Sequence, residues 1–294
     1  MKIIVTGSLG NIGKPLTREL LQNGHDVTVI SSTANKQAEI ESMGAKAAIG
    51  SIEEANFVAG VFRNADAAFC MTPPNFGAAD QIDYYEKIAH SYANAIVNSG
   101  IKRIIYLSSY GAHLNSGTGF ITGSNLGERI LDAVPDILLT HVRPTYFYYN
   151  LAAFIPMIKN AGFIGSVYGG EDALATVDPK DIARVIAREL TDFKNVKKVC
   201  YVSSDERTCN EVARILGSAI GKPDLQWRIL PREQVMQSLL AHGVSNNTAQ
   251  NIIELGEATH SGILRQDYEL NKPALGQVKI EDFAKEFAAA YNER

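Results

Sequence analysis

Hydrophobic residues follow two alternating patterns along the first half of the chain. Short continuous apolar runs alternate with longer stretches in which apolar residues recur every three or four positions. The first pattern is typical of buried parallel strands, and the second is typical of amphipathic helices. The strand-like runs cover residues 3–5, 27–30, 46–49, 67–71 and 104–107, and the clearest helical stretch covers residues 80–98. This alternation predicts an α/β fold with a doubly wound parallel sheet and right-handed crossovers.

The alternation continues to about residue 150 and becomes less regular beyond it. Residues 123–134 are expected to form a helix, and residues 137–142 and 198–202 a sixth and a seventh strand. We therefore expect one α/β domain over residues 1–150, whose sheet the strand near 198–203 joins. Residues 151–294 are expected to form a smaller C-terminal α+β substrate lobe, built from separated segments. Its expected elements are a glycine-rich hairpin or loop at 163–170 and helices at 179–190, 209–220, 232–242 and 281–291.

A glycine-rich turn connects the first strand to the first helix. Gly7, Gly10 and Gly13 follow the strand at a G-x-x-G-x-x-G spacing, and the helical pattern starts directly afterwards. Gly7 is expected to let the chain reverse, Gly10 to let a pyrophosphate approach the backbone, and Gly13 to let the helix pack closely on the sheet. The positive end of that helix faces the phosphates. The residues expected to hold the pyrophosphate are Gly7, Ser8, Gly10, Asn11 and Ile12, and Gly13 is a further expected cofactor-binding residue. Residues 1–150 are therefore expected to form an NAD(P)-binding Rossmann domain.

Composition excludes several classes of protein. Of the 294 residues, 46% are hydrophobic and 20% are charged, as in an ordinary globular protein. The net charge of −4, without a run of Lys or Arg, argues against binding to nucleic acid. The three cysteines form no C-x-x-C pair, so we expect buried thiols and no metal site. The first apolar run is too short for a signal peptide and none is long enough to span a membrane, so a cytoplasmic protein without a membrane partner is expected.

The end of the second strand indicates which dinucleotide is bound. An NAD site usually has an acidic residue about twenty positions beyond the glycines, where it holds the ribose 2′-hydroxyl. This chain has Ser31, Ser32 and Thr33 there, with Lys36 just beyond. The missing acid and the nearby lysine favour NADP(H), with NAD as a possible cofactor, although Lys36 is equally typical of a solvated helix charge. The ends of later strands add Thr72, Pro73 and Ser108 as expected cofactor contacts.

Several segments resemble one known family. They are the glycine turn at 6–13, the strand and its end at 65–73, the Leu-Ser-Ser-Tyr-Gly-Ala segment at 107–112, the Arg-Pro-Thr-Tyr-Phe segment at 143–147 and the segment at 177–183. Together they resemble the NmrA-like proteins, which are atypical short-chain dehydrogenases, over about residues 1–190. The resemblance implies a Rossmann fold that binds NAD(P). It also implies either a reductase, such as the quinone and phenylpropanoid reductases of that family, or a regulator that binds the dinucleotide without turning it over.

The proton relay of short-chain dehydrogenases is missing from its expected place. Those enzymes use a Tyr-x-x-x-Lys pair, in which the lysine lowers the pKa of the tyrosine that protonates the reduced carbonyl. The corresponding positions here are Phe120 and Ser124. The literal match at Tyr268 and Lys272 lies far beyond the sheet, and we interpret it as chance. Reduction of simple carbonyls is therefore doubtful, whereas reduction of a quinone gives a stabilised anion and needs no strong acid.

Aromatic residues are the remaining candidates for the site. Tyr110 and Tyr146 are the two candidate catalytic side chains, although Tyr110 also fits a packed residue that shapes the cleft, and His113 is expected to be solvated in a Gly/Ser/Asn loop. In the cluster at 146–149, with Phe154, one or two rings are expected to pack in the core under the second lobe. The other rings are expected to form a wall for a planar, apolar or aromatic substrate, and the loop at 163–170 its lid. Two functions stay open: an NAD(P)H-dependent reductase of quinone-type acceptors, and a non-catalytic NADP(H)-sensing protein. The oligomeric state is not indicated.

Overall fold

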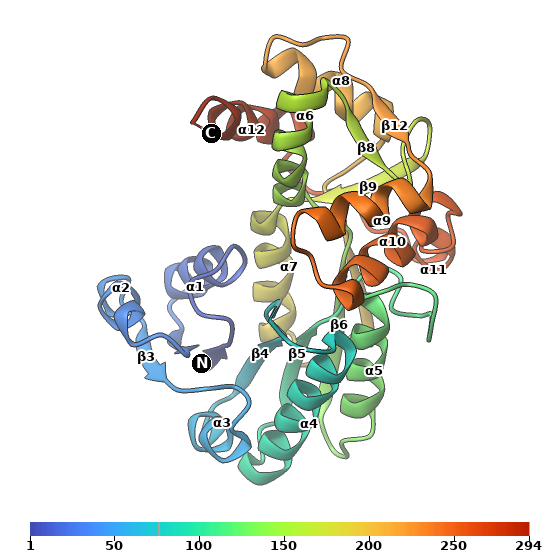
Figure 1. Ribbon diagram of the computed structural model, residues 1–294. Coiled ribbons are helices and arrows are strands. Elements are labelled where there is room, and N and C mark those ends of the chain that lie inside the picture. The colour runs from blue at the N-terminus through green and yellow to red at the C-terminus, as the bar shows by residue number, and fades with distance from the viewer. Residues whose placement is uncertain (76, 294) are drawn as a thin grey trace.

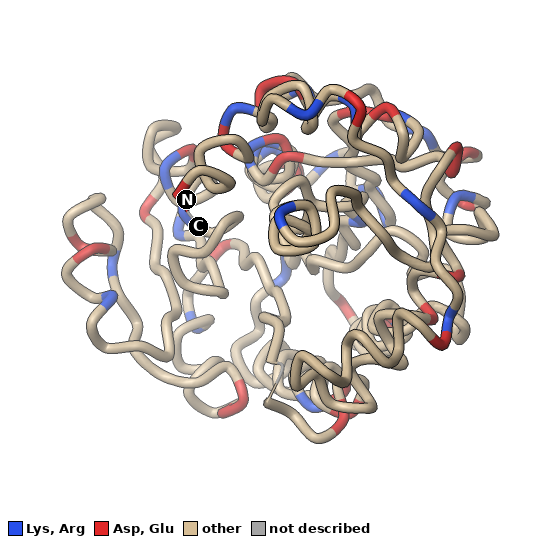
Figure 2. The backbone as a smooth tube through the Cα atoms, turned by 45° about the horizontal axis from the view of Figure 1, so that its top comes forward, with Lys and Arg blue, Asp and Glu red and all other residues tan. Residues whose placement is uncertain are grey.

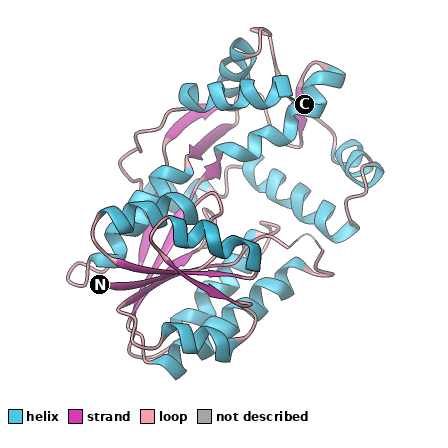
Figure 3. Ribbon diagram, turned by 90° about the vertical axis from the view of Figure 1, so that its left-hand side faces the viewer, coloured by secondary structure: helices cyan, strands magenta, loops and turns pink. Residues whose placement is uncertain are grey.

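The computed structural model describes residues 1–75 and 77–293, and a parallel sheet of seven strands forms its centre (Figures 1 and 3). The strand order is β10-β6-β5-β4-β1-β2-β3, and all neighbouring strands run parallel. The strands are β1 (Lys2–Val5), β2 (Asp26–Ser31), β3 (Lys46–Ile49), β4 (Ala67–Met71), β5 (Arg103–Leu107), β6 (Leu138–Pro144) and β10 (Val199–Val202). The winding direction reverses between β1 and β4, and ligands of such sheets bind at the carboxyl ends of the strands beside this point. The expected α/β fold with a doubly wound parallel sheet is confirmed.

Helices cover both faces of the sheet, as Figure 3 shows. On one face lie α1 (Gly13–Gln22) and α7 (Pro179–Thr191), and on the other lie α3 (Ala55–Phe62), α4 (Gln81–Ser99) and α5 (Ile121–Asp132). Strand residues alternate between the two cores, so that Ile3 and Val5 face α1 and α7 while Ile4 faces the other layer. The short η1 (Ala34–Lys36) and α2 (Gln37–Ser42) connect β2 to β3 at the edge.

A second group of elements has its own core, which includes Trp227, Phe283 and Phe287. Its two small sheets have the orders β11-β9-β7 and β12-β8. The strands are β7 (Tyr146–Phe147), β8 (Ile164–Ser166), β9 (Ala173–Val177), β11 (Asp205–Thr208) and β12 (Trp227–Ile229). The helices are η2 (Tyr148–Phe154), α6 (Ile155–Ala161), α8 (Cys209–Ala219), α9 (Arg232–Ala241), α10 (Asn246–His260), α11 (Arg265–Leu270) and α12 (Ile280–Glu293). The segment at 163–170 is not a hairpin, because β8 pairs in parallel with the distant β12.

The chain returns to the central sheet within its second half. Helix α7 packs against α1, and β10 pairs in parallel with β6 at the sheet's edge. A division at residue 150 therefore separates α7 and β10 from the sheet to which they belong, and that boundary stays a prediction.

Helices α10 and α11, which the hydrophobic pattern did not reveal, cover the loop that follows β5. A Cβ atom on Gly111 would lie 2.6 Å from Leu264 Cδ2, and one on Gly119 would lie 2.1 Å from the carbonyl oxygen of Asn251. At its start α10 also reaches α4, because Asn247 Nδ2 donates to Asp80 Oδ2 at 3.0 Å. The glycines of the loop therefore make room for these two helices.

Charged residues of both signs are interspersed along the backbone, as Figure 2 shows. Among the helices in the described part of the chain, none is long and apolar enough to cross a membrane.

Candidate functional site

The glycine turn between β1 and α1 lies at the switch point of the sheet. Gly7 has a φ of +86°, and a Cβ atom there would lie 2.4 Å from Met71 Sδ. A Cβ atom on Gly13 would lie 2.1 Å from the carbonyl oxygen of Ser8, so Gly13 closes the turn on itself. A side chain at position 13 would thus collide with the turn and not with the sheet, so the expectation that Gly13 lets the helix pack on the sheet is wrong. A Cβ atom on Gly10 would have only the carbonyl oxygen of Gly7 within contact distance, at 3.3 Å. The other side of Gly10 is therefore open to a ligand.

The same turn presents unpaired donors to that open side. Within residues 1–75 and 77–293, the backbone N–H groups of Asn11, Ile12 and Gly13 have no hydrogen-bond acceptor. The first turn of α1 holds no acidic side chain, and Ile12 offers no side-chain cap. The free donors and the positive end of α1 together suit an anion such as a pyrophosphate.

The end of β2 is tied directly to the glycine turn. Ser8 Oγ donates to Ser31 Oγ at 3.0 Å, and Ser31 is buried while Ser32 is exposed. Lys36 does not stand alone, because its Nζ binds Glu39 at 2.8 Å. Lys14 binds the other oxygen of the same carboxylate at 2.9 Å. Hydrogen bonds from Lys36 and Lys14 lower the pKa of Glu39 to about 2. Sequence reasoning missed Lys14 and Glu39, although Lys14 directly follows the last glycine of the turn.

Ser108, at the end of β5, contacts a buried ionic network. Its Oγ donates to Glu128 Oε1 at 2.5 Å. Arg143 donates to both oxygens of Glu128, at 2.8 and 2.6 Å, and to Asp267 at 3.0 Å. This network joins β5, α5, β6 and α11. At the neighbouring end of β4, Thr72 is buried and Pro73 is half-buried.

Tyr110 packs beneath α11 and not freely at the strand ends. Its ring meets that of Tyr268 edge-on, with 5.7 Å between the centroids. Burial raises the pKa of Tyr110, and the nearby guanidinium of Arg265 acts in the opposite direction. Tyr268 itself donates to Glu206 at 2.6 Å, and Lys272 binds Glu206 at 2.9 Å. The literal Tyr-x-x-x-Lys match is therefore engaged with Glu206 in the second group of elements.

His113 is not solvated, contrary to the expectation for its loop. Both ring nitrogens are buried, and neither has a hydrogen-bond partner among the described residues. Burial lowers the pKa of the imidazole, while the charges of Asp267 and Glu128 raise it and that of Arg143 lowers it. A neutral imidazole thus lies beside the ionic network with its hydrogen-bonding capacity unused.

The aromatic cluster at 146–149 divides between two environments. Tyr148 is fully buried and stacks on Phe283, and Tyr146 packs against the same core, where burial raises its pKa to about 12. Phe147 packs instead against the core of the central sheet. It stacks on Tyr149 with 5.2 Å between the ring centroids.

Tyr149 lies near the side chain of Asn11 in the glycine turn. Burial raises the pKa of the Tyr149 phenol, and the nearby Asn11 side chain acts in the opposite direction. The wall at the strand ends is thus Phe147 and Tyr149, and Tyr146 and Tyr148 belong to the second core. Phe120 precedes α5 and Ser124 is buried within it, so α5 carries no Tyr/Lys relay at these positions.

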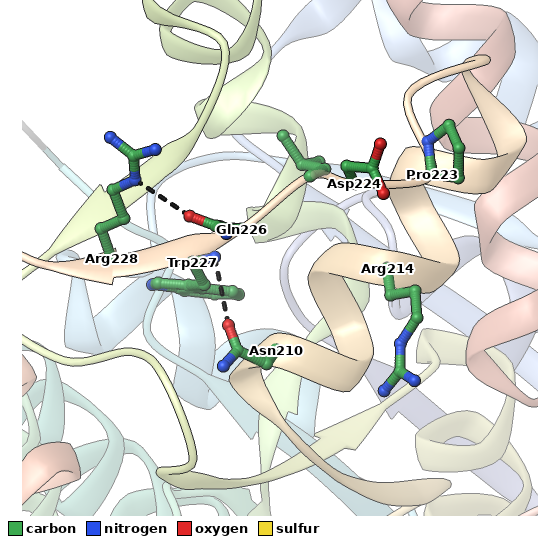
Figure 4. Close-up of a pocket in the computed structure, with 8 residues that line it drawn as sticks. Asn210, Arg214, Pro223, Asp224, Gln226, Trp227 and Arg228 are labelled. Atoms are coloured by element: carbon green, nitrogen blue, oxygen red, sulfur yellow. Dashed lines mark hydrogen bonds between the residues drawn. The ribbon is translucent and has the colours of Figure 1, made fainter.

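An open depression of about 480 Å³ lies elsewhere, between α8 and the segment leading into β12 (Figure 4). Asn210 Oδ1 accepts a 3.4 Å hydrogen bond from the backbone of Trp227 at its floor, and Arg214 and Arg228 flank it. None of the site residues expected from the sequence lines it. Within the described residues no group of three or more His, Cys, Asp or Glu side chains is placed to hold a metal ion.

A model of the NmrA-like family matches residues 1–283 of the chain. The chain belongs to the NmrA-like family. The match extends well beyond the first 190 residues, to which the sequence resemblance had been traced, and takes in most of the second group of elements.

Relatives within reach of sequence comparison are reductases. The chain is 24% identical over 293 residues to an NAD(P)H azoreductase of Xenophilus azovorans, covering 98% of this chain and 99% of that protein. It is 25% identical over 240 residues to the (4-alkanoyl-5-oxo-2,5-dihydrofuran-3-yl)methyl phosphate reductase of Streptomyces griseus, covering 81% and 80%.

Solved structures share the fold of this NmrA-like chain. The triphenylmethane reductase of a Citrobacter species, solved with NADP(H), superposes with a TM-score of 0.81 at 18% identity, covering 97% of this chain and 99% of that one. The NADPH-dependent quinone oxidoreductase of Escherichia coli, in complex with NADPH, gives 0.79 at 17% identity with the same coverage. At such identities these likenesses show the fold alone.

Proposed function

We propose that this NmrA-like chain is an NADPH-dependent reductase that acts on a planar, electron-poor acceptor, namely a quinone. One arrangement above all supports this function. Phe147 and Tyr149 form a stacked pair, and the Asn11 side chain of the glycine turn lies close enough to the Tyr149 phenol to lower its pKa. A flat apolar surface is therefore next to the place where a dinucleotide is expected to bind.

The glycine turn suits the cofactor's pyrophosphate. The free N–H groups of Asn11, Ile12 and Gly13 would hold the phosphates, and the open side of Gly10 would admit them. Ser31, Ser32 and Lys36 would hold the adenosine ribose, and Thr72, Pro73 and Ser108 border the nicotinamide end. A nicotinamide bound at that end supplies a hydride.

The acceptor side favours a quinone over a simple ketone. Ketone reduction needs a positioned acid of matched pKa, and Phe120 and Ser124 stand at the relay positions. A hydroquinone anion is stabilised by its ring and takes its proton from water. Aromatic stacking on Phe147 and Tyr149 would hold the planar acceptor. The azoreductase relative is, by its name, an NAD(P)H-dependent reductase of azo compounds.

The experiment measures NADPH oxidation with a panel of benzoquinones, naphthoquinones, azo dyes, aldehydes and ketones. We expect turnover with quinones and little with aldehydes or ketones. Tyr149→Ala should raise the KM for the quinone at least several-fold, whereas Phe193→Ala, which truncates an exposed ring elsewhere, should not. Tyr110→Phe and Tyr146→Phe remove only the hydroxyls, and they test the catalytic role predicted for these tyrosines. Tight NADPH binding without turnover on any acceptor would favour the non-catalytic, NADP(H)-sensing alternative.

A further inference from the structure

Three charged side chains form a compact cluster beside the glycine turn. Lys14 is the second residue of α1, Lys36 is the last residue of η1, and Glu39 lies in the first turn of α2. The lysines bind opposite oxygens of the one carboxylate, at 2.9 and 2.8 Å. The cluster therefore carries one net positive charge, and each side chain is one-third to one-half exposed.

This cluster borders the expected position of the adenosine ribose. Lys14 follows the glycine turn directly, and Lys36 follows the end of β2, where Ser32 and Thr33 are exposed. The hydrogen bond between Ser8 and Ser31 holds these two segments together at 3.0 Å. In doubly wound sheets the ribose 2′-position is recognised at the end of the second strand. Both ammonium groups therefore extend from the two segments that flank it.

One carboxylate, that of Glu39, engages both ammonium groups. A 2′-phosphate is a doubly charged anion that would attract the same two lysines, and it would be repelled by the carboxylate between them. Because its carboxylate keeps a pKa of about 2, Glu39 stays ionised throughout the range in which the protein would act. The carboxylate would therefore compete with the phosphate at every such pH.

We propose that Lys14 and Lys36 form a 2′-phosphate subsite that Glu39 occupies when no cofactor is bound, so that Glu39 sets the discrimination between NADPH and NADH. The inference rests on the proposed function, because it requires the dinucleotide to bind at the glycine turn. NADH has no 2′-phosphate, so its affinity is indifferent to which anion the lysines hold. Glu39 is thus a specificity-determining residue that limits the preference for NADPH.

The test compares dissociation constants for NADPH and NADH by titration calorimetry. In Glu39→Gln the lysines are released, and NADPH should bind roughly three- to tenfold more tightly, with NADH unchanged. In Lys14→Gln and in Lys36→Gln, NADPH should bind more weakly by a similar factor. The affinity for adenosine 2′,5′-bisphosphate should change in each variant as the affinity for NADPH does. The affinity for adenosine 5′-monophosphate should stay unchanged, as for NADH, which gives a readout without the nicotinamide.

Lys46→Gln is the matched control. It removes one lysine from an exposed ion pair with Asp26, at 2.7 Å, at the opposite end of β2 and β3. It should leave the ratio of the two affinities unchanged, which separates a local phosphate contact from a change in net charge.

Two results would overturn the inference, and they are distinguishable. If the wild type binds both dinucleotides and Glu39→Gln leaves their affinity ratio unchanged, the subsite assignment is wrong and the proposed function stands. If the wild type binds neither dinucleotide, both the proposed function and the subsite assignment are wrong.

Discussion

Gly10 and Gly13 lie three residues apart in one turn, yet a side chain would meet different surroundings at each. At Gly13 a Cβ atom would collide with the backbone carbonyl of Ser8 at 2.1 Å, and backbone cannot yield as a flexible side chain can. At Gly10 the nearest atom is 3.3 Å away and the other side is open. The first glycine thus leaves room for a ligand, and the second is required by the turn.

We expect Gly10→Val and Gly13→Ala to separate these two roles. Gly10→Val should weaken NADPH binding at least tenfold with little change in melting temperature. Gly13→Ala should lower the melting temperature, because overpacking costs about 1–3 kcal/mol. Gly60→Ala, in α3 with open space around it, is the control and should leave the protein as stable or more so. Calorimetry measures both quantities, and unchanged NADPH affinity in Gly10→Val would contradict the assignment of the turn.

His113 combines buried nitrogens with an unused capacity for hydrogen bonds. Such groups cost stability, and an apolar replacement of similar size can recover it. We expect His113→Leu to raise the melting temperature by about 2–4 °C. His90→Leu, on the exposed surface of α4, should have no comparable effect. A melting temperature that falls by several degrees would show that the His113 ring is hydrogen-bonded in solution.

The sequence predicted the glycine turn well because glycine spacing directly reports backbone requirements. It predicted the positions of Ser31 and Lys36 but not their partners, since Glu39 and Lys14 are joined by folding and not by a motif. It also placed Tyr146 in the substrate wall. Adjacent residues after β6 face opposite sides, and a cluster of four aromatic residues gives no sign of which rings face the strand ends.

At the scale of elements, α11 is held to β11 by one carboxylate. Glu206 accepts a hydrogen bond from Tyr268 at 2.6 Å and pairs with Lys272 and Arg265 at 2.9 and 3.1 Å. Burial acts to raise the pKa of Glu206, but these three partners outweigh it, and the pKa lies below its ordinary value. The ionised carboxylate is therefore the form that stabilises this contact between α11 and β11.

This lowered pKa fixes the sign of a pH effect. The stabilisation is fully present above the unfolded pKa of about 4.3 and is lost as the pH falls through the lower, folded value. We expect Glu206→Gln to reduce stability at pH 7 by roughly 1–3 kcal/mol and to reduce the loss of stability between pH 7 and pH 3. Glu286→Gln, which removes an exposed partner of Lys180, should change neither. Denaturant unfolding at several pH values measures the free energy of unfolding. A loss of stability between pH 7 and pH 3 that is as large in Glu206→Gln as in the wild type would contradict the assignment.

The hydrophobic pattern of the sequence did not predict helices α10 and α11. Of the buried residues of α10 only Ile253 is large and apolar, and the short α11 buries Tyr268 alone, so neither helix makes a clear apolar stripe. Asn251 lies against Gly119 of the loop after β5, and Gly256 lies against Val167 and Tyr168. A helix whose packing partner is a loop has few large apolar residues by which a sequence pattern reveals it.

Over the whole molecule, the central sheet follows from the hydrophobic pattern, and the second group of elements does not. Buried parallel strands are continuous apolar runs that can be recognised locally, and each is followed by its helix. In the second group β8 pairs with β12 and β7 with β9, across long separations in sequence. Strands of two or three residues hold too little local pattern to indicate such partners.

Taken together, the glycine turn with its free N–H groups and the stacked Phe147 and Tyr149 rings form the site that we propose at the carboxyl ends of the central strands. We propose that this site serves a hydride transfer from NADPH to a quinone. The most direct measurement is the rate of NADPH oxidation, followed by the loss of its near-ultraviolet absorbance, with and without an added naphthoquinone. We expect oxidation that requires the quinone, persists in Ser124→Ala and is lost in Gly10→Val. Rapid reduction of simple ketones, or NADPH that binds tightly without oxidation by any quinone, would contradict it.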